Sequence, residues 1–350
     1  MTDVNKNKFQ GKNPNFKTGK EILHSIVEEI RQDLEGIELG RWQKPWTDIL
    51  KLQDLPKNAT TGEYYRGFNV FQLWGLAHKL GYPVNEWATF MQYKKSNIHL
   101  KKGALSGYII KYGTMEKAPE DLRDGSLKER HQKAFENGET DKETVTLMYV
   151  KSYPVFNVSQ TQGYEEKYLS AEILTKEEKD SKAFAMANEI EMFCGAEIHR
   201  GMNRAYFMPS KNIIAMPVIG QFGSVEEYIQ VFFHELTHYF GSEHHLNRTY
   251  DSKKDQQRKG YAFEELVAEL GSCLLCAHCG VSNVEIRQNH KRYIKSWIAL
   301  LKDDPEAFQR ASTLAFASFE YTLKVCEENK QKAIDNGTYV INSENNMQIA

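Results

Sequence analysis

The residues best suited to chemistry lie in the C-terminal half of the chain. His234 and His238 stand four residues apart in an apolar stretch that is predicted to be helical. One helical turn brings both imidazoles onto one face, as a tetrahedral zinc site requires. Glu235 is offset by one residue, so its carboxylate can reach a water on the metal without binding the metal itself. This spacing predicts a zinc site that hydrolyses peptide bonds with Glu235 as general base, and Mn²⁺ or Co²⁺ would suit the same donors.

A third metal ligand can come from either of two places in the sequence. In the first alternative, Gly241 turns the chain and His244 completes an elongated histidine pattern. That pattern also needs a methionine turn beneath the metal, and the only methionine after His244 is Met347, near the end of the chain. We therefore do not favour His244.

The second alternative is an acidic stretch, residues 261–270, on the next predicted helix. Glu265 and Glu269 are one turn apart, so Glu265 can bind the metal while Glu269 supports a ligand histidine from behind. We favour Glu265 as the third ligand. The neighbouring Glu264 remains an alternative third ligand, because the sequence does not fix which of the two adjacent glutamates faces the metal.

A small sheet and several helices must position these side chains. Helices are predicted at about 180–193, at 225–240 around the histidines, from about 263, and over 282–332. Two predicted strands, 205–208 and 212–216, precede the histidine helix, as the edge strand does in a zincin. The C-terminal half is therefore expected to be a mostly helical, zincin-like module with a small edge-strand sheet.

The N-terminal half follows a different pattern. A polar tail, residues 1–17, precedes an amphipathic helix that is predicted from residue 18 to about residue 36. Strand-like alternation appears at 107–113 and again at 144–151. The highly charged residues 116–143 between them are predicted to be a surface excursion that joins two paired strands.

Aromatic residues alternate with lysine and arginine between residues 41 and 102. Such a mixture suits stacking on unpaired bases and contact with phosphates. Aromatic residues at these spacings are equally suited to a buried core. The pattern alone leaves both interpretations open.

Composition limits the class of protein. The 350 residues suffice for two domains, and 41% hydrophobic with 26% charged residues is typical of soluble globular proteins. No apolar run approaches the roughly 20 residues that cross a bilayer, and the N-terminus lacks a secretory signal, so we expect a cytoplasmic protein. The net charge of −2 gives no global attraction to nucleic acid, and DNA binding would need a local patch.

The five cysteines are expected to be reduced thiols, because their number is odd and the chain is too large to need disulfides. Cys273, Cys276 and Cys279 follow one another at three-residue intervals within an apolar, helical-looking segment. We interpret them as small buried hydrophobic residues and not as a second metal site.

Taken together, the motifs resemble those of the ArdC family of antirestriction proteins over roughly residues 20–300. The matching positions are Pro45-Trp46, Asn58, Thr61-Gly62, Tyr64, Gly67-Phe-Asn69, Trp87-Ala-Thr89-Phe90-Met-Gln92, Lys101-Lys102-Gly103, Phe156-Asn-Val158, Gln160, Tyr206, Ile213, Met216-Pro217, His234-Glu-Leu, His238, Leu246-Asn-Arg248, Tyr261-Ala, Glu264-Glu265-Leu-Val-Ala-Glu269. This chain departs from the family where it has Gly103-Ala-Leu-Ser-Gly107 in place of Gly-Glu-Lys-Gly, and Asn212 in place of an aspartate.

The resemblance implies an N-terminal domain that binds single-stranded DNA, a C-terminal zincin-like metallopeptidase domain, and a role in protecting incoming mobile DNA from restriction. The DNA contacts that we expect on this basis are Trp46, Tyr64, Arg66, Asn69, Trp87, Gln92, Lys101 and Lys102.

We therefore predict an α+β protein of two domains. An α/β DNA-binding module spans 18–165 and the metallopeptidase module spans 172–335, with tails at 1–17 and 336–350. Its partners would be single-stranded DNA and a protein substrate or a component of a restriction system, with no membrane. The alternative is a non-catalytic protein that shields DNA and holds a purely structural metal.

Overall fold

The computed structural model describes residues 55–122, 125–137, 144–164, 176–248, 257–281 and 291–339, with some residues between 24 and 35. Those described between 24 and 35 are helical, as the sequence predicts. The predicted tail 1–17, residues 340–350 of the predicted C-terminal tail, Trp46 and the predicted domain boundary at 165–172 lie outside the described residues. Residues 336–339, the start of the predicted C-terminal tail, hydrogen-bond to the end of the preceding helix. Two compact units are present: a smaller one with Tyr108–Tyr153 as its body, and a larger one made of Ile26–Gly107 and Pro154–Ala350.

The smaller unit contains most of two long neighbouring strands, β3 (Gly107–Lys117) and β4 (Val145–Asn157). The charged segment between them forms a 3-10 turn, Pro119–Asp121, and helix α5 (Gly125–Glu136). No side chain of α5 is buried, which agrees with the surface position predicted for this segment.

The first part of the larger unit contains two short strands of the same sheet and the helices beside them. The sheet has the order β1-β2-β4-β3, in which β1 (Lys57–Asn58) is parallel to β2 (Glu86–Ala88) and β2 is antiparallel to β4. Helix α3 (Phe68–Lys79) buries Leu73 and Trp74, and α4 (Phe90–Lys95) follows β2 directly.

A second, three-stranded sheet belongs to the C-terminal half. Its order is β5-β7-β6, with β5 (Glu197–Arg200) parallel and β6 (Tyr206–Met208) antiparallel to β7 (Ile213–Met216). The two predicted strands are confirmed as β6 and β7. The charged β5 has no hydrophobic alternation, so the sequence did not indicate it. Among the described strands, β6 pairs only with β7 and forms an edge.

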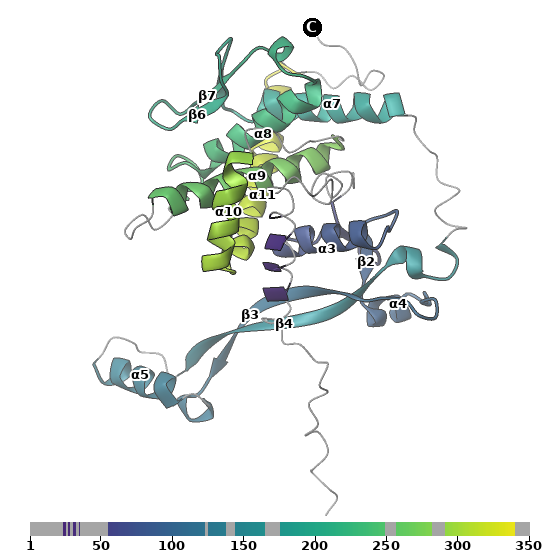
Figure 1. The fold of residues 1–350 in the computed structure, drawn as a ribbon, viewed down its shortest axis with the longest axis vertical. Helices are drawn as coiled ribbons and strands as arrows, with labels where there is room; N and C mark the ends of the chain where they lie inside the picture. The colour runs from purple at the N-terminus through teal and green to yellow at the C-terminus, as the bar shows by residue number, and fades with distance from the viewer. Residues whose placement is uncertain are drawn as a thin grey trace, which may run out of the picture. The chain divides into compact units, whose positions relative to one another are not determined.

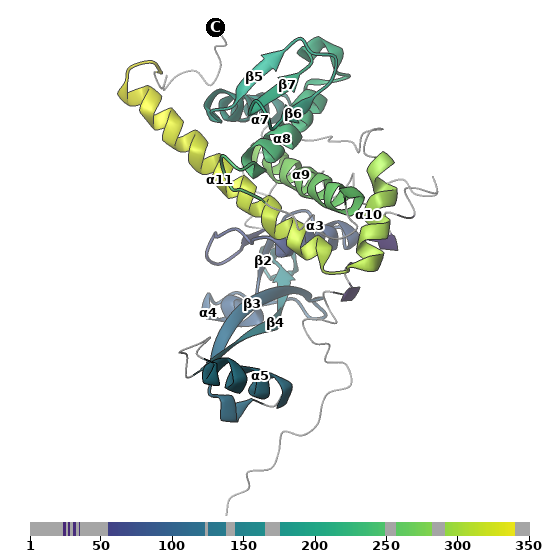
Figure 2. The ribbon, with the colours of Figure 1, turned by 90° about the vertical axis from the view of Figure 1, so that its left-hand side faces the viewer.

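Helices make up the rest of this half: α7 (Lys176–Phe193), α8 (Val225–Gly241), α9 (Gln257–Cys279), α10 (Lys291–Asp303) and α11 (Ala307–Asp335). Figures 1 and 2 show α9 among its neighbours, and it packs against all four other helices. Its middle is fully buried because its apolar residues surround the whole helix.

The five cysteines are buried and form no disulfide, as expected for small hydrophobic residues. Burial raises the pKa of Cys273 and Cys279 well above the ordinary value, so both are neutral thiols. Across the described ranges, no helix combines the length and the apolar character that a bilayer span requires.

Helices α8 and α9 approach each other closely where Gly271 of α9 faces Thr237 of α8. A Cβ atom at Gly271 would overlap the Thr237 side chain, whose hydroxyl donates to the carbonyl of Phe233. Beside this contact, the Ser272 hydroxyl donates to the Gln230 carbonyl at 2.8 Å. The absence of a side chain at Gly271 therefore sets the distance between the two helices.

We predict that Gly271→Ala lowers the free energy of unfolding by about 1–3 kcal/mol, because the added methyl overpacks this contact. Urea unfolding followed by circular dichroism measures the change. Gly220→Ala is the control: a Cβ there meets no atom within 4 Å, and we expect a change within about 0.5 kcal/mol. Equal effects of the two substitutions would contradict this account of the packing.

Candidate metal centre

The N-terminus of the motif helix α8 is stabilised by a side-chain cap and by acidic residues. Ser224 caps its N-terminus by accepting from the backbone N–H of Glu227, and Glu226 and Glu227 occupy the first turn, where negative charge is favourable. Its apolar face is buried, and His234 is buried with it. The helix predicted at 225–240 is thereby confirmed with an end one residue later.

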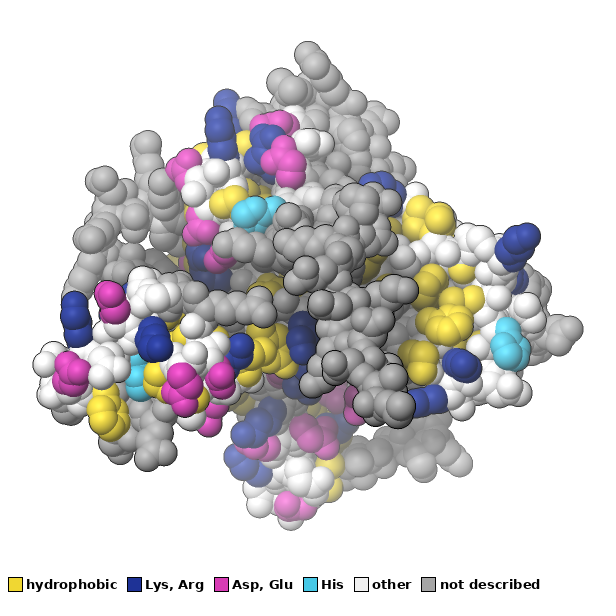
Figure 3. All heavy atoms as spheres, turned by 90° about the horizontal axis from the view of Figure 1, so that it is seen from below, with side chains coloured by type: hydrophobic (Ala, Val, Ile, Leu, Met, Phe, Trp, Pro, Cys, Tyr) yellow, Lys and Arg dark blue, Asp and Glu magenta, His cyan; other side chains and the backbone are white. Residues whose placement is uncertain are grey.

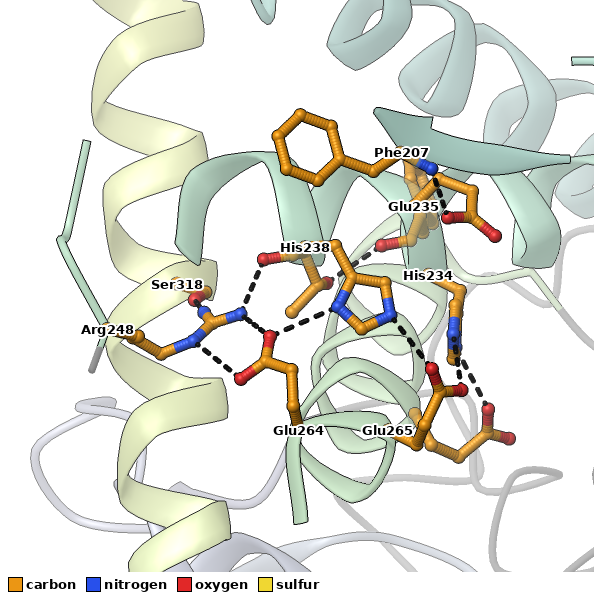
Figure 4. A network of polar contacts seen from close by, with 11 residues as sticks. Phe207, His234, Glu235, His238, Arg248, Glu264, Glu265 and Ser318 are labelled. Atoms are coloured by element: carbon orange, nitrogen blue, oxygen red, sulfur yellow. Dashed lines mark hydrogen bonds and ion pairs between the residues drawn. The ribbon is translucent and has the colours of Figure 1, made fainter. Parts of the chain in front are cut away.

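Three side chains from α8 and α9 converge on one point (Figure 4). The Nε2 atom of His234 lies 3.5 Å from one carboxylate oxygen of Glu265, and Nε2 of His238 lies 3.7 Å from the other. One donor atom from each of the three residues lies within 4.8 Å of the other two. Metal–donor bonds of about 2.0–2.2 Å would separate tetrahedral donors by roughly 3.3–3.6 Å, so this donor set fits a divalent cation.

Two further carboxylates orient the histidines from behind. Nδ1 of His238 lies 3.1 Å from Glu264, and Nδ1 of His234 lies 3.4 Å from Glu269. An acceptor at Nδ1 fixes the tautomer in which Nε2 carries the lone pair that a metal needs. The structure thus brings Glu265 together with the histidines and gives Glu264 and Glu269 supporting positions.

The site is strongly negative. Burial alone would raise the pKa of Glu264 and Glu265, but hydrogen bonds and charges from the histidines, and from Arg248 beside Glu264, lower both below the ordinary value. Burial alone would lower the pKa of His234, but Glu265 and Glu269 raise it to about 10. The lowered pKa values of the two glutamates and the raised pKa of His234 all show that the surroundings stabilise positive charge, such as that of a cation, at the point where the three donors meet.

Glu235 lies beside the three donors and does not belong to them. Its carboxylate accepts a hydrogen bond of 2.9 Å from the backbone N–H of Phe207, on edge strand β6. A cleft of about 810 Å³ opens here, and β6, α8 and the first turns of α9 contribute to its walls. The general-base candidate therefore faces both the donor set and the free edge of the sheet.

Other histidine and tyrosine side chains near the motif differ in whether they line the cleft. His244 is half exposed, lies 3.9 Å from Glu243, and is not part of the donor set. The Tyr239 hydroxyl donates to the carbonyl of Gly195, and His245 packs against the Tyr239 ring. None of these three side chains lines the cleft.

Tyr206 and Tyr261 do line the cleft. Tyr261 is half exposed and hydrogen-bonds to Glu265, one turn after it on α9. Sequence reasoning did not single it out as a functional side chain. The available signal was its position four residues before the third ligand, since residues at that spacing share a helix face.

Two of the residues expected to contact DNA have structural roles in the fold. Trp87 is completely buried, and its indole N–H donates to Asn85, so it cannot stack on a base. The Gln92 side chain closes the capping box of α4 by accepting from the Thr89 backbone. Asn69 is half-buried in the first turn of α3.

The remaining candidates are exposed. Tyr64 is 55% exposed, and Phe90, which was not among the expected contacts, is 53% exposed. Arg66 lies 3.1 Å from Glu320 with most of its side chain in solvent. Lys101 and Lys102 are exposed on the turn before β3, where Lys101 also donates to the carbonyl of Ser159. Figure 3 shows a face on which exposed hydrophobic side chains lie with lysine and arginine side chains near them.

Fold and site together define a two-domain protein with a zincin-like C-terminal domain. Residues 185–314 match the family described as zincin-like metallopeptidase, and residues 20–156 match the N-terminal domain of anti-restriction factor ArdC. The chain belongs to the ArdC family of antirestriction proteins.

Solved structures and curated relatives agree with this assignment. The metal-free crystal structure of the antirestriction protein ArdC from plasmid R388 is 28% identical, with a TM-score of 0.65, and the match covers 87% of this chain and 98% of that one. Its Mn(II)-bound structure is 30% identical, with a TM-score of 0.61 and the same coverage.

An uncharacterized protein, y4eC, from Sinorhizobium fredii is 29% identical over 304 residues, which cover 85% of this chain and 90% of y4eC. The DNA primase TraC of Escherichia coli is 30% identical over 328 residues, which cover 90% of this chain and 29% of TraC. The chain thus corresponds to less than a third of that primase.

We predict that the protein binds one equivalent of a divalent metal, and that His234→Ala, His238→Ala and Glu265→Ala each weaken binding by more than the roughly 10–100-fold typical of an outer partner. His244→Ala should bind like the parent. Titration of metal-free protein with Zn²⁺ or Mn²⁺ by calorimetry measures this. Loss of binding in His244→Ala together with full binding in Glu265→Ala would reverse the ligand assignment.

Proposed function

We propose that this antirestriction protein is a metallopeptidase that acts in association with single-stranded DNA. The observation that carries the proposal is a set of three protein donors beside a glutamate, at the base of an open cleft. Structural zinc sites are closed by four protein ligands, whereas catalytic sites keep one position for water or substrate. Within the part of the chain that the structure describes, the set has three donors, which favours a catalytic site over a purely structural one.

His234, His238 and Glu265 would hold the cation, with Glu264 and Glu269 orienting the two imidazoles. Zinc is our first choice, and manganese is an alternative that the Mn(II)-bound relative supports. When bound, such a cation polarises a carbonyl and makes a water more acidic. The carboxylate of Glu235 takes the proton from the attacking water and later delivers it to the leaving amine.

The edge strand and one tyrosine complete the proposed mechanism. An extended peptide can pair with the free edge of β6, where the Phe207 N–H points toward Glu235. This pairing would hold the scissile bond beside the general base. Of the two tyrosines in the cleft, Tyr261 is the better placed to donate to the developing oxyanion, because its hydroxyl already reaches Glu265.

Single-stranded DNA binding is assigned by this proposal to the N-terminal domain, with the division between domains at 165–172. The membership of the ArdC family supports it, as do the exposed aromatic and basic side chains of this part of the chain. We propose contacts by Tyr64, Arg66, Lys101 and Lys102, with Phe90 in place of the buried Trp87. We further propose a cytoplasmic location, with single-stranded DNA and a protein substrate or a component of a restriction system as partners; the DNA-associated family supports this.

The alternative function is passive shielding of DNA with no hydrolysis. It requires only the N-terminal contacts, and in that case the metal would stabilise the C-terminal domain alone. The open cleft above Glu235 favours the peptidase, because a shielding protein has no use for a general base at a free strand edge.

We predict that Glu235→Gln reduces cleavage of an unfolded protein probe, fluorescein-labelled β-casein, by about 10²–10⁴-fold. Metal content and DNA binding should stay at the parent level, because glutamine can still accept from the Phe207 N–H. Initial rates with and without a single-stranded oligonucleotide measure the effect.

Glu243→Gln is the control for this substitution, since this nearby glutamate is exposed. Parent-like cleavage by Glu235→Gln would refute the peptidase, and retained protection of DNA by it would favour shielding.

We also predict that the double substitution Lys101→Ala with Lys102→Ala weakens binding to a single-stranded oligonucleotide. The slope of log affinity against log salt should fall by roughly one for each lost phosphate contact. Fluorescence anisotropy at several salt concentrations measures the slope. Lys302→Ala, an exposed lysine on α10, should leave it unchanged. An unchanged slope in the double variant would remove this turn from the DNA contacts.

A further inference from the structure

Arg248 is a buried cation whose contacts converge on the metal centre. Its side chain is 4% exposed. Nη2 and Nε donate to the two carboxylate oxygens of Glu264, at 2.5 and 3.3 Å, and Nη2 also donates to the carbonyl of Thr237 at 2.9 Å. Nη1 donates to the hydroxyl of Ser318 on α11. Figure 4 shows the guanidinium between α11 and the glutamate that supports His238.

The chain reaches this position through a tight turn after α8. The Arg248 backbone N–H donates to the carbonyl of Gly241, and Asn247 adopts a left-handed conformation with φ of 45°. Asparagine tolerates this conformation better than most residues. A Cβ atom at Gly241 would overlap the guanidinium, so the glycine leaves the space that Arg248 occupies.

Glu264 is held from two sides as a result. Its oxygen Oε1 accepts from Nδ1 of His238 and also from Arg248. A carboxylate that contacts only a histidine could rotate about its side-chain bonds. The guanidinium of Arg248 restricts this rotation because it donates hydrogen bonds to both carboxylate oxygens of Glu264. The orientation of the His238 imidazole therefore depends on Arg248 as well as on Glu264.

We propose that Arg248 is a positioning residue of the metal centre, which acts through Glu264 to hold Nε2 of His238 toward the metal, with Ser318 as its anchor. The match to the zincin-like family ends at residue 314, so the anchor lies beyond the matched region. The metal centre of this chain thus includes the turn after α8 and a residue of α11. The inference rests on the proposed metal site and not on peptide hydrolysis.

The test is the affinity of metal-free protein for Zn²⁺, titrated against a competing chelating dye. We expect Arg248→Lys and Glu264→Gln to bind one equivalent about 10–100-fold more weakly than the parent, the range typical of an outer partner. Lysine keeps the charge but loses the fork, so it should not restore affinity. Ser318→Ala should show a smaller loss, because both charges remain.

Arg200→Lys is the matched control, since Arg200 pairs with Glu191 away from the metal donors. Parent-like zinc affinity in both Arg248→Lys and Glu264→Gln would overturn the proposal, as would an equal loss in Arg200→Lys. If Arg248→Lys fails to fold, Glu264→Gln and Ser318→Ala decide the matter in the same way. Because the assay uses no peptide, a parent that binds zinc without cleaving β-casein would refute the proposed activity and leave this result standing.

Discussion

The close packing of α8 on α9 is the constraint on which the site depends. Neither helix carries a complete donor set: α8 supplies the two imidazoles and the general base, and α9 supplies the carboxylates. Gly271 brings the helices together at Thr237, and this distance allows Glu265 to reach both Nε2 atoms. A wider spacing would leave two histidines on one helix and an acidic face on another, with no common centre.

Burial of charge is the second constraint, and it explains why the site needs several partners. Four carboxylates, those of Glu235, Glu264, Glu265 and Glu269, lie around two imidazoles. Charges withdrawn from water must be paired or must bind a metal. Arg248 balances one of them and the Phe207 N–H solvates another, so the remaining negative charge is concentrated where the donors meet. The same arrangement that fixes the ligands therefore also attracts a divalent cation.

The sequence predicted the parts of this site that depend on spacing within one helix. His234, Glu235 and His238 follow from helical periodicity, and so do the two strands before them. Position across helices is harder to predict, because the relative rotation of α8 and α9 decides which of Glu264 and Glu265 reaches the Nε2 atoms of the histidines and which reaches Nδ1 of His238. Arg248 acquires its role from a turn whose path depends on a glycine and a left-handed asparagine. Trp87 illustrates the same limit, since an aromatic residue beside basic ones carries no information about its burial.

The most direct test of the account is the position of the metal itself. Anomalous diffraction from crystals of the zinc-loaded protein, measured on both sides of the zinc absorption edge, locates the ion directly. We predict one strong peak about 2.0–2.2 Å from Nε2 of His234, Nε2 of His238 and an oxygen of Glu265. Glu264 would remain on Arg248 and Nδ1 of His238. A peak bound by His244 or by Glu264, or one remote from all three donors, would contradict it.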